Sequence, residues 1–339
     1  MMKITVSLIV VVLVALLKVA TVAYSVSVVD EGLLIVTTFP SLVNDIKQLV
    51  TQSDHVVSLV PIGVDPHEYQ LTVGDVELLR RADVIVSTGH TPFEKRIREL
   101  VEVGELSAVL IEIPRIKGIE ILNNPMTGLP NLHMPIYDPL NYIIFIDNVT
   151  RTLQKLKPEN ADIYDSKRLS IILNISRLLA RTPRIYLEAV ADIPPTQYAV
   201  SWLGVKVKYF LVREHGIPVT PSDLEVIRDE IARKHIKLAI VTKPATTISK
   251  QLIELANEYN IPILYVSSPL SSTSILEKLN DIARQVTSLT KHYTTSYRGL
   301  HSVEGGRVVS YGYTIIGVIA VISIAILIAY MVLRGRRTV

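Results

Sequence analysis

Short apolar runs alternate with amphipathic stretches along the first third of the chain. The apolar runs predict buried strands, and the stretches between them, with apolar residues three and four positions apart, predict helices. The predicted strands cover residues 32–38, 55–60, 82–87 and 108–113, and the predicted helices cover residues 41–50, 72–81 and 93–101. Strands that alternate with helices over short turns indicate a parallel sheet covered on both faces.

The same pattern restarts after Pro183, and a long helical stretch lies between the two patterns. It is predicted as one helix from Asn141 to about residue 156 and another that begins at Pro158 and runs to about residue 179. The later strands are predicted at residues 184–189, 205–212, 238–242 and 263–266, and the later helices at 196–203, 221–234, 248–260 and 273–289. The sequence therefore predicts an α/β fold with two parallel-sheet, Rossmann-like lobes joined by a long connecting helix. The predicted boundaries are 26–140 for the N-terminal lobe, 141–182 for the connector and 183–289 for the C-terminal lobe.

Both ends of the chain carry apolar segments next to positive charge. Residues 1–25 have a charged start, a short apolar run and small residues before position 26, which predicts a signal peptide, with an uncleaved anchor as the alternative. Residues 311–334 predict a C-terminal transmembrane helix after a stalk at 290–310, and the arginines beside the tail 335–339 favour the cytoplasmic side. We therefore expect a single-pass protein of the cell membrane with an extracellular ectodomain.

Composition and motifs exclude several classes of function. The chain has 339 residues and no cysteine, which excludes disulfides, thiolate catalysis and cysteine-ligated zinc. The net charge of +3 comes from dispersed residues and argues against a nucleic-acid partner. The sequence also lacks a glycine-rich phosphate loop, a serine nucleophile elbow and a His-Glu-x-x-His motif. We therefore expect a binding protein and not an enzyme.

Three histidines stand out by their place after predicted strands or in stiffened loops. Pro61 and Pro66 restrict the loop that carries His67, and His133 lies in a second proline-rich loop. A neutral imidazole in a fixed orientation is a good metal ligand, although a lone histidine in such a loop is more often only a turn residue. His90 follows the third predicted strand, so His67 and His90 are expected at the carboxyl edge of the same sheet, where ligands bind.

These segments together resemble the metal-type solute-binding proteins of ABC transporters, the zinc and manganese receptors. The resemblance rests on segments that occur in the same order as in the family: residues 33–40, 59–69, 72–75, 82–89, 132–133, 138–141 and 156–161. It is weaker beyond residue 183. The resemblance implies two α/β lobes joined by one rigid helix, a metal bound between them, and His67 and His133 as two of its ligands.

The chain departs from this family in the C-terminal lobe. The family's third ligand position holds Ile193 and its fourth holds Ser268, and neither is a good metal ligand. Two imidazoles alone do not make a strong zinc site. The candidate replacements are His90, Asp192, His215, Glu214 and Glu188.

We therefore interpret the chain as a membrane-tethered, monomeric receptor that captures Zn²⁺ or Mn²⁺ as its transported ligand and delivers it to an ABC permease with its ATPase. One alternative is a receptor of the same fold whose metal site has lapsed and which binds a chelate or another small solute. Another is a surface adhesion or sensing protein.

Overall fold

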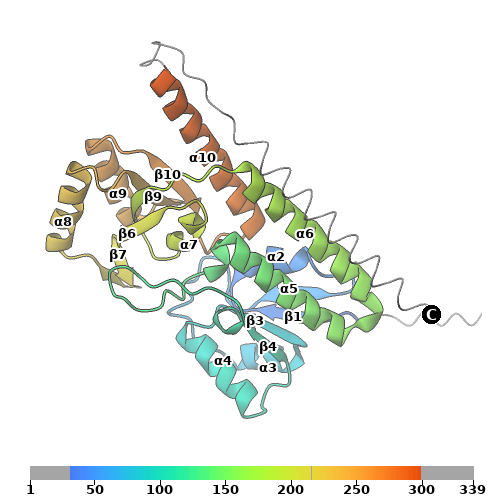
Figure 1. Cartoon of the computed structure of the whole chain (residues 1–339). Coiled ribbons are helices and arrows are strands. Elements are labelled where there is room, and N and C mark those ends of the chain that lie inside the picture. Colours follow the sequence, from blue (N-terminus) through green and yellow to red (C-terminus); the bar gives the residue numbers. More distant parts are fainter. Residues whose placement is uncertain (1–30, 215, 299–339) are drawn as a thin grey trace, which may run out of the picture. The chain divides into compact units, whose positions relative to one another are not determined.

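The computed structural model describes residues 31–214 and 216–298, with side chains up to residue 290. The N-terminal lobe contains a four-stranded sheet in the order β2-β1-β3-β4, and every pairing in it is parallel. Its strands are β1 (Leu34–Thr37), β2 (His55–Ser58), β3 (Val84–Ser87) and β4 (Val109–Glu112). Its helices are α2 (Val43–Lys47), α3 (Val73–Arg81) and α4 (Pro92–Glu102), and they lie around the sheet in Figure 1.

The C-terminal lobe repeats this topology. Its sheet has the order β10-β9-β5-β6, so in both lobes the second strand lies on one side of the first, and the third and fourth lie on the other. The strands are β5 (Glu188–Ala191), β6 (Lys206–Phe210), β9 (Leu238–Lys243) and β10 (Ile263–Ser267). The helices are α7 (Thr196–Ser201), α8 (Pro221–Ala232), α9 (Thr247–Glu258) and α10 (Ile275–Arg298). The prediction of two parallel-sheet α/β lobes is therefore confirmed.

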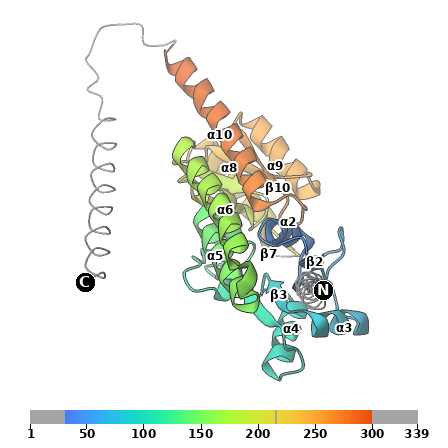
Figure 2. The ribbon, with the colours of Figure 1, turned by 90° about the vertical axis from the view of Figure 1, so that its right-hand side faces the viewer.

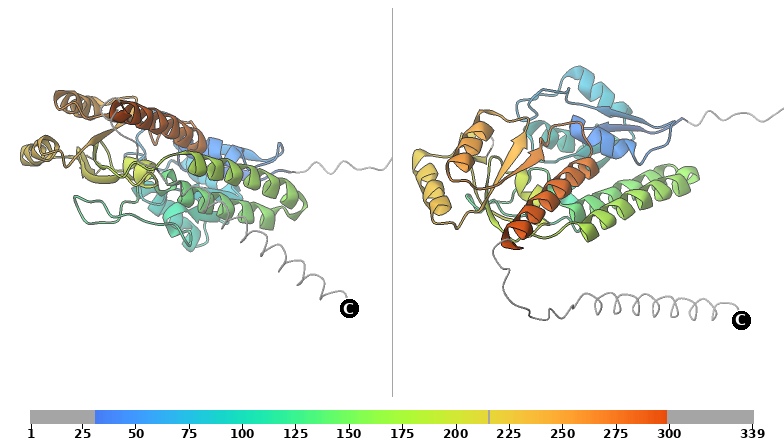
Figure 3. Two further views of the ribbon diagram at one scale, coloured as in Figure 1. Left: turned by 45° about the horizontal axis from the view of Figure 1, so that its top comes forward. Right: turned by 90° about the horizontal axis from the view of Figure 1, so that it is seen from above.

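The predicted break of the connector before Pro158 is confirmed, but the two helices fold back on each other and do not form one long connecting helix. The connector is a hairpin of α5 (Pro139–Leu156) and α6 (Ala161–Arg181), joined by the turn η4 (Pro158–Asn160). Gln154 donates to the carbonyl of Ala161, and Arg168 bonds Asp147, so the two helices run antiparallel and side by side (Figures 1 and 3). A proline disfavours helical geometry in the residue before it, which explains why the first helix ends before Pro158.

Several element boundaries also differ from those predicted. The strand expected at 184–189 begins only at Glu188, because β5 pairs with β6 from that residue onward and the preceding Tyr186 has a φ of 45°. The strand expected at 205–212 is divided into β6 and a short antiparallel hairpin of β7 (Val212–Glu214) and β8 (Ile217–Pro218). Short 3-10 turns occur at Pro40–Leu42, Ile113–Arg115 and Pro135–Tyr137 (η1, η2 and η3).

One hydrophobic core extends from the N-terminal sheet through α5 and α6 to α10. It includes Ile85 from the sheet, Phe145 from α5 and Leu279 from α10. Figure 2 shows α10 beside α6, and Arg181 at the end of α6 bonds Asn280 of α10. The described chain up to residue 290 therefore forms one compact unit that contains both lobes.

The predictions for the chain ends fall largely outside the described residues. These are the signal peptide at 1–25, the transmembrane helix at 311–334 and the tail at 335–339. Within the described residues, no helix is both long enough and apolar enough to span a membrane. The helix predicted to end at residue 289 continues to Arg298, so the expected stalk at 290–310 begins as helix.

Candidate metal site

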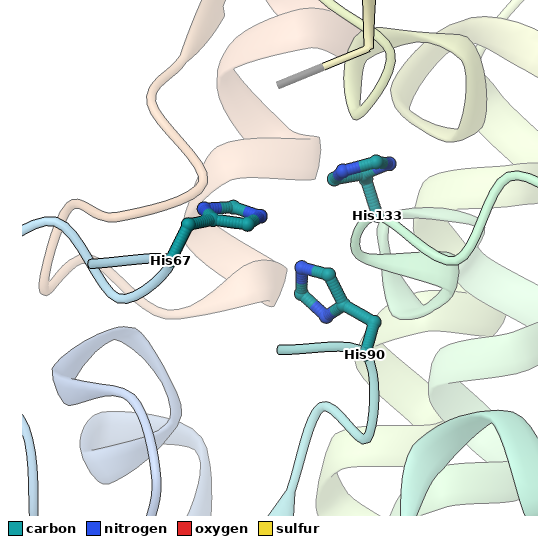
Figure 4. A group of neighbouring side chains, drawn as sticks. All are labelled: His67, His90 and His133. Atoms are coloured by element: carbon teal, nitrogen blue, oxygen red, sulfur yellow. The ribbon is translucent and has the colours of Figure 1, made fainter. Parts of the chain in front are cut away.

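Three histidines from separate loops of the N-terminal lobe converge on one point. His67 lies between β2 and α3, His90 lies between β3 and α4, and His133 precedes the turn η3 that leads into α5. Figure 4 shows the three rings turned toward one another. The first two loops follow the carboxyl ends of β2 and β3, which lie on either side of β1 in the sheet, and the third belongs to the long loop before the connector.

The distances between the rings suit a metal ion. The ring centroids are 5.0 Å apart for His90 and His133, 5.2 Å for His67 and His90, and 5.9 Å for His67 and His133. One ring nitrogen from each histidine lies within 4.8 Å of the other two. Zinc–nitrogen bonds of about 2.0–2.1 Å in a tetrahedral site would bring such atoms to roughly 3.3 Å of one another. Shortening these separations by up to about 1.5 Å would therefore place all three nitrogens on one ion.

In each ring, Nδ1 contacts an oxygen that can orient it. The contacts are with Asp65 Oδ1 at 3.2 Å for His67, with Thr88 Oγ1 at 2.9 Å for His90, and with Asn131 Oδ1 at 3.1 Å for His133. An acceptor at Nδ1 favours the tautomer with hydrogen on that atom and leaves the lone pair on Nε2. Metal-binding histidines are oriented in the same way by such outer partners.

The loop of His67 is fixed by its own residues. Gly63 has a φ of 87°, which permits the turn between Pro61 and Asp65. Asp65 Oδ1 accepts a hydrogen bond from the backbone N–H of His67 at 2.9 Å and also contacts Nδ1 of its ring. One carboxylate therefore holds both the backbone and the side chain of His67. The His67 side chain keeps 25% of its surface exposed, which leaves it accessible from the cleft.

The loop of His90 is organised by Glu94, a fully buried residue of α4. The carboxylate of Glu94 accepts the backbone N–H groups of Thr88 at 2.7 Å and of His90 and Thr91 at 3.0 Å each. It also accepts hydroxyl groups from Thr38, Ser87, Thr88 and Thr91. Burial raises the pKa of Glu94, but the neighbouring His90 and these hydrogen bonds outweigh it and lower the pKa below its usual value. The carboxylate thus stays ionised and holds the loop.

Asn131 holds His133 and also joins the two lobes. Its Oδ1 accepts from the backbone N–H of His133 at 3.1 Å, and its Nδ2 donates to the carbonyl of Pro194 and the side chain of Gln197 in the C-terminal lobe. Met134, directly after His133, has a left-handed φ of 54°. Such a conformation is rare for a residue other than glycine and is found most often at functional sites.

The histidines line a cavity of about 390 Å³ between the lobes. Most of its opposite wall is apolar and comes from the C-terminal lobe, with these residues: Ile193, Pro194, Pro195, Val212, Gly216, Thr246, Ile248, Pro269 and Leu270. Ile193, at the family position of the third ligand, therefore faces the site without offering a donor atom. Ser268, at the fourth, uses its backbone carbonyl to accept from Tyr137.

Two of the other candidate ligands lie away from the cluster. Asp192 is buried, and its carboxylate accepts from the N–H and hydroxyl of Thr242 and from the hydroxyl of Ser249. We therefore drop Asp192 as a proposed ligand, because these bonds turn it into its own lobe. Glu188 lies 3.5 Å from Lys208 on β6, and His215 is outside the described residues.

Glu214, on β7, has a carboxylate that lies near the cluster from the C-terminal lobe. Its Oε2 is 3.9 Å from Nε2 of His133. Sequence reasoning singled out neither Glu94 nor Asn131. The spacing Thr91-x-x-Glu94 before an apolar helix was a readable capping signal, whereas nothing in the sequence around Asn131 indicates that it bridges the lobes.

A two-lobed α/β fold with a histidine cluster between the lobes is that of a metal-type solute-binding protein. The family comparison matches residues 35–288 to ZnuA, the periplasmic zinc-uptake complex component A. The match covers most of the chain, so the chain belongs to this family of metal-binding, substrate-binding proteins of ABC transporters. The family resemblance read from the sequence is confirmed.

The names of individual relatives refer to different metals. The chain is 28% identical over 250 residues to the iron-binding protein YfeA of Yersinia pestis, covering 69% of this chain and 77% of that protein. It is 23% identical over 261 residues to the manganese ABC transporter substrate-binding lipoprotein PsaA of Streptococcus pneumoniae, covering 69% and 79%. A solved structure of FpvC from Pseudomonas aeruginosa with Mn²⁺ shares the fold, with a TM-score of 0.62, 20% identity, and coverage of 78% and 99%.

Proposed function

We propose that this protein captures a divalent transition-metal ion with His67, His90 and His133 and delivers it to an ABC permease with its ATPase. The observation that carries the proposal is the convergence of three imidazoles whose Nδ1 atoms are each held by a neighbouring oxygen. Imidazole ligands suit Zn²⁺, and added carboxylate oxygen would admit Mn²⁺. The ion is the transported substrate, so no catalytic step is required of the chain.

We further propose that the protein works as a monomer outside the cell, held to the membrane by residues 311–334. This placement rests on the uncharged C-terminal segment followed by arginines. Relatives such as PsaA are named as lipoproteins. A helical anchor in place of a lipid would keep the receptor near its permease by the same principle of raised local concentration.

Titration of the metal-free, full-length chain with Zn²⁺ and with Mn²⁺ tests the proposal. We expect one ion per chain and loss of binding in His67→Ala, because two imidazoles alone do not hold zinc strongly. His235→Ala is the matched control, because this histidine is exposed and lies beside Glu230 on the surface. Wild-type protein that binds neither ion would contradict the proposal and favour the alternative of a lapsed metal site.

A further inference from the structure

We infer that Glu214 supplies a fourth ligand to the metal from the C-terminal lobe. The inference rests on the proposed function, since it concerns the same ion. The three histidines all come from the N-terminal lobe, whereas zinc in a closed protein site is almost always four-coordinate. At the two C-terminal positions where the family would place ligands, the chain has Ile193 and Ser268. A ligand from that lobe must therefore come from elsewhere, and Glu214 is close enough to provide it.

Glu214 lies close to one of the three histidines. Oε2 of Glu214 lies 3.9 Å from Nε2 of His133, whereas the ligand atoms of the three histidines lie up to 4.8 Å from one another. Two ligand atoms of a tetrahedral zinc site are roughly 3.3 Å apart. The carboxylate has little distance to close toward His133, but it is not among the ligand atoms that all lie within 4.8 Å of one another, so a shared ion requires the hairpin of β7 and β8 to move toward the other two histidines.

The position of Glu214 is fixed by a buried partner. Asn124, which is fully buried, donates from Nδ2 to Glu214 Oε1 at 3.1 Å and to the carbonyl of Arg213 at 2.7 Å. Its Oδ1 in turn accepts from the backbone N–H of Met126. One carboxylate oxygen is therefore held by the long loop before the connector, and the other is directed to His133. Carboxylates that bind metals are oriented by hydrogen bonds of this kind.

Charge also favours Glu214. The carboxylates of Asp65 and Glu94 lie beside the Nδ1 atoms of His67 and His90, whereas a carboxylate bound to the ion itself would compensate its charge directly in a cavity with a largely apolar wall. A carboxylate also adds the harder oxygen that Mn²⁺ prefers over nitrogen alone. The competing explanation is an ion pair between Glu214 and protonated His133, which would make no contribution to the affinity for metal.

A bond from Glu214 to the ion has a structural consequence. The hairpin of β7 and β8 would then be tied through the metal to three loops of the N-terminal lobe, so binding of the ion would link the two lobes directly. Backbone amide groups of residues 212–218 should exchange more slowly once metal is bound. A permease that contacts both lobes could distinguish the loaded receptor by this link.

The test compares Glu214→Ala and Glu214→Gln with Glu225→Gln, which makes the same chemical change at an exposed position of α8. Full-length proteins are titrated with Zn²⁺ and Mn²⁺, their Co²⁺ forms are examined by visible absorption spectroscopy, and amide exchange is followed with and without Zn²⁺. We expect Glu214→Ala to lower the Zn²⁺ affinity by at least the ~10–100-fold typical of losing an outer-shell partner. The affinity for Mn²⁺ should fall by a larger factor than that for Zn²⁺, and the visible spectrum of the Co²⁺ form should change. Metal should no longer slow the amide exchange of the hairpin of β7 and β8.

The outcomes separate this inference from the proposed function. If the wild type binds metal, His67→Ala does not, and Glu214→Ala matches the wild type in affinity, spectrum and exchange, then Glu214 is only an ion-pair partner and the inference is wrong. If the wild type binds no metal, the proposed function itself fails. Thermal unfolding of the metal-free variants checks that Glu214→Ala is folded, and Glu214→Gln, which keeps the side-chain shape, provides the same test with less disturbance.

Discussion

Replacing Glu94 by alanine should both destabilise the protein and weaken metal binding. The side chain of Glu94 is fully buried, and its two oxygens accept three backbone N–H groups and four hydroxyl groups of the loop and strands around His90. The alanine variant would leave those donors without their charged acceptor in a site closed to solvent. This loop is what presents His90 to the other two histidines.

The expected loss of stability follows from the number of backbone donors affected. A hydrogen bond to a charged group contributes roughly 1.5–3 kcal/mol, and a buried donor left unsatisfied costs about 1–3 kcal/mol. The three N–H groups of Thr88, His90 and Thr91 give a simple sum of roughly 4.5–9 kcal/mol, but water can enter the space left by the side chain and the contributions are not additive. We therefore expect about 3–5 kcal/mol, which for a protein of this size lowers Tm by on the order of 10 °C.

Thermal and denaturant unfolding of the metal-free protein would measure this effect. Glu99→Ala is the matched control, because Glu99 lies on the same helix and forms only an exposed pair with Arg96. Exposed pairs of this kind contribute about 0–1 kcal/mol. The stability of Glu94→Gln should lie between those of Glu94→Ala and Glu99→Ala. The amide keeps the shape of the side chain and one acceptor oxygen, but it points an NH₂ group at the other donors.

Metal titration of the same variants separates stability from positioning. In folded Glu94→Gln, the zinc affinity should fall by roughly 10–100-fold, as is typical when a partner that orients a ligand is lost. If the free energy of unfolding of Glu94→Ala lies within about 1 kcal/mol of the wild-type value, this explanation is wrong, because the buried donors must then be satisfied without the carboxylate. Unchanged zinc affinity in Glu94→Gln would show that His90 is positioned by other contacts.

Two further predictions concern buried carboxylates outside the cluster. Asp192→Asn should lower stability by about 1–3 kcal/mol through its bonds to Thr242 and Ser249, while calorimetric titration should find the zinc affinity unchanged; a large loss of affinity would restore Asp192 as a ligand. Burial raises the pKa of Asp45 from 3.8 to about 6, so the folded protein holds this proton more tightly than the unfolded chain does. The stability that Asp45 contributes is thus present at low pH and is lost as the pH rises through about 6. Denaturant unfolding at several pH values should show that the free energy of unfolding changes with pH over this range in the wild type, and that Asp45→Asn lacks this change. The same pH dependence in both proteins would contradict the prediction.

The lobes could be predicted from the sequence because their strands are short apolar runs separated by amphipathic helices. The boundaries that failed were those decided by partners elsewhere in the chain. Residues 184–187 are as apolar as many strands, yet β5 starts at Glu188 because that is where β6 pairs with it. Pro158 marked the division of the connector into two helices, but their periodicity did not show that the second folds back along the first, because that depends on contacts between the two helices.

The candidate site was predictable where the local sequence determines a conformation. Pro61, Gly63 and Pro66 restrict the loop of His67, and this was visible without a structure. The environment of Asp192 was not visible, because an acidic residue at the end of a strand can face either the cleft or its own lobe, and only the neighbouring strand and helix decide which. The same limit applied to Glu94, whose capping pattern was readable but whose contacts with the loop of His90 depend on the tertiary fold.

The repeated topology explains why the histidines gather in one lobe. In each sheet the cleft faces the point where the strand order reverses, between β1 and β3 in the N-terminal lobe and between β5 and β9 in the C-terminal lobe. In the first lobe, the backbone donors at this point are satisfied by Glu94 from the helix behind, so the loop can direct His90 outward. In the second, Asp192 satisfies Thr242 and Ser249 from the loop position itself, and the residue left facing the cleft is Ile193. Glu214, on the hairpin that follows β6, is then our candidate for a ligand from the C-terminal lobe, because its carboxylate lies near His133.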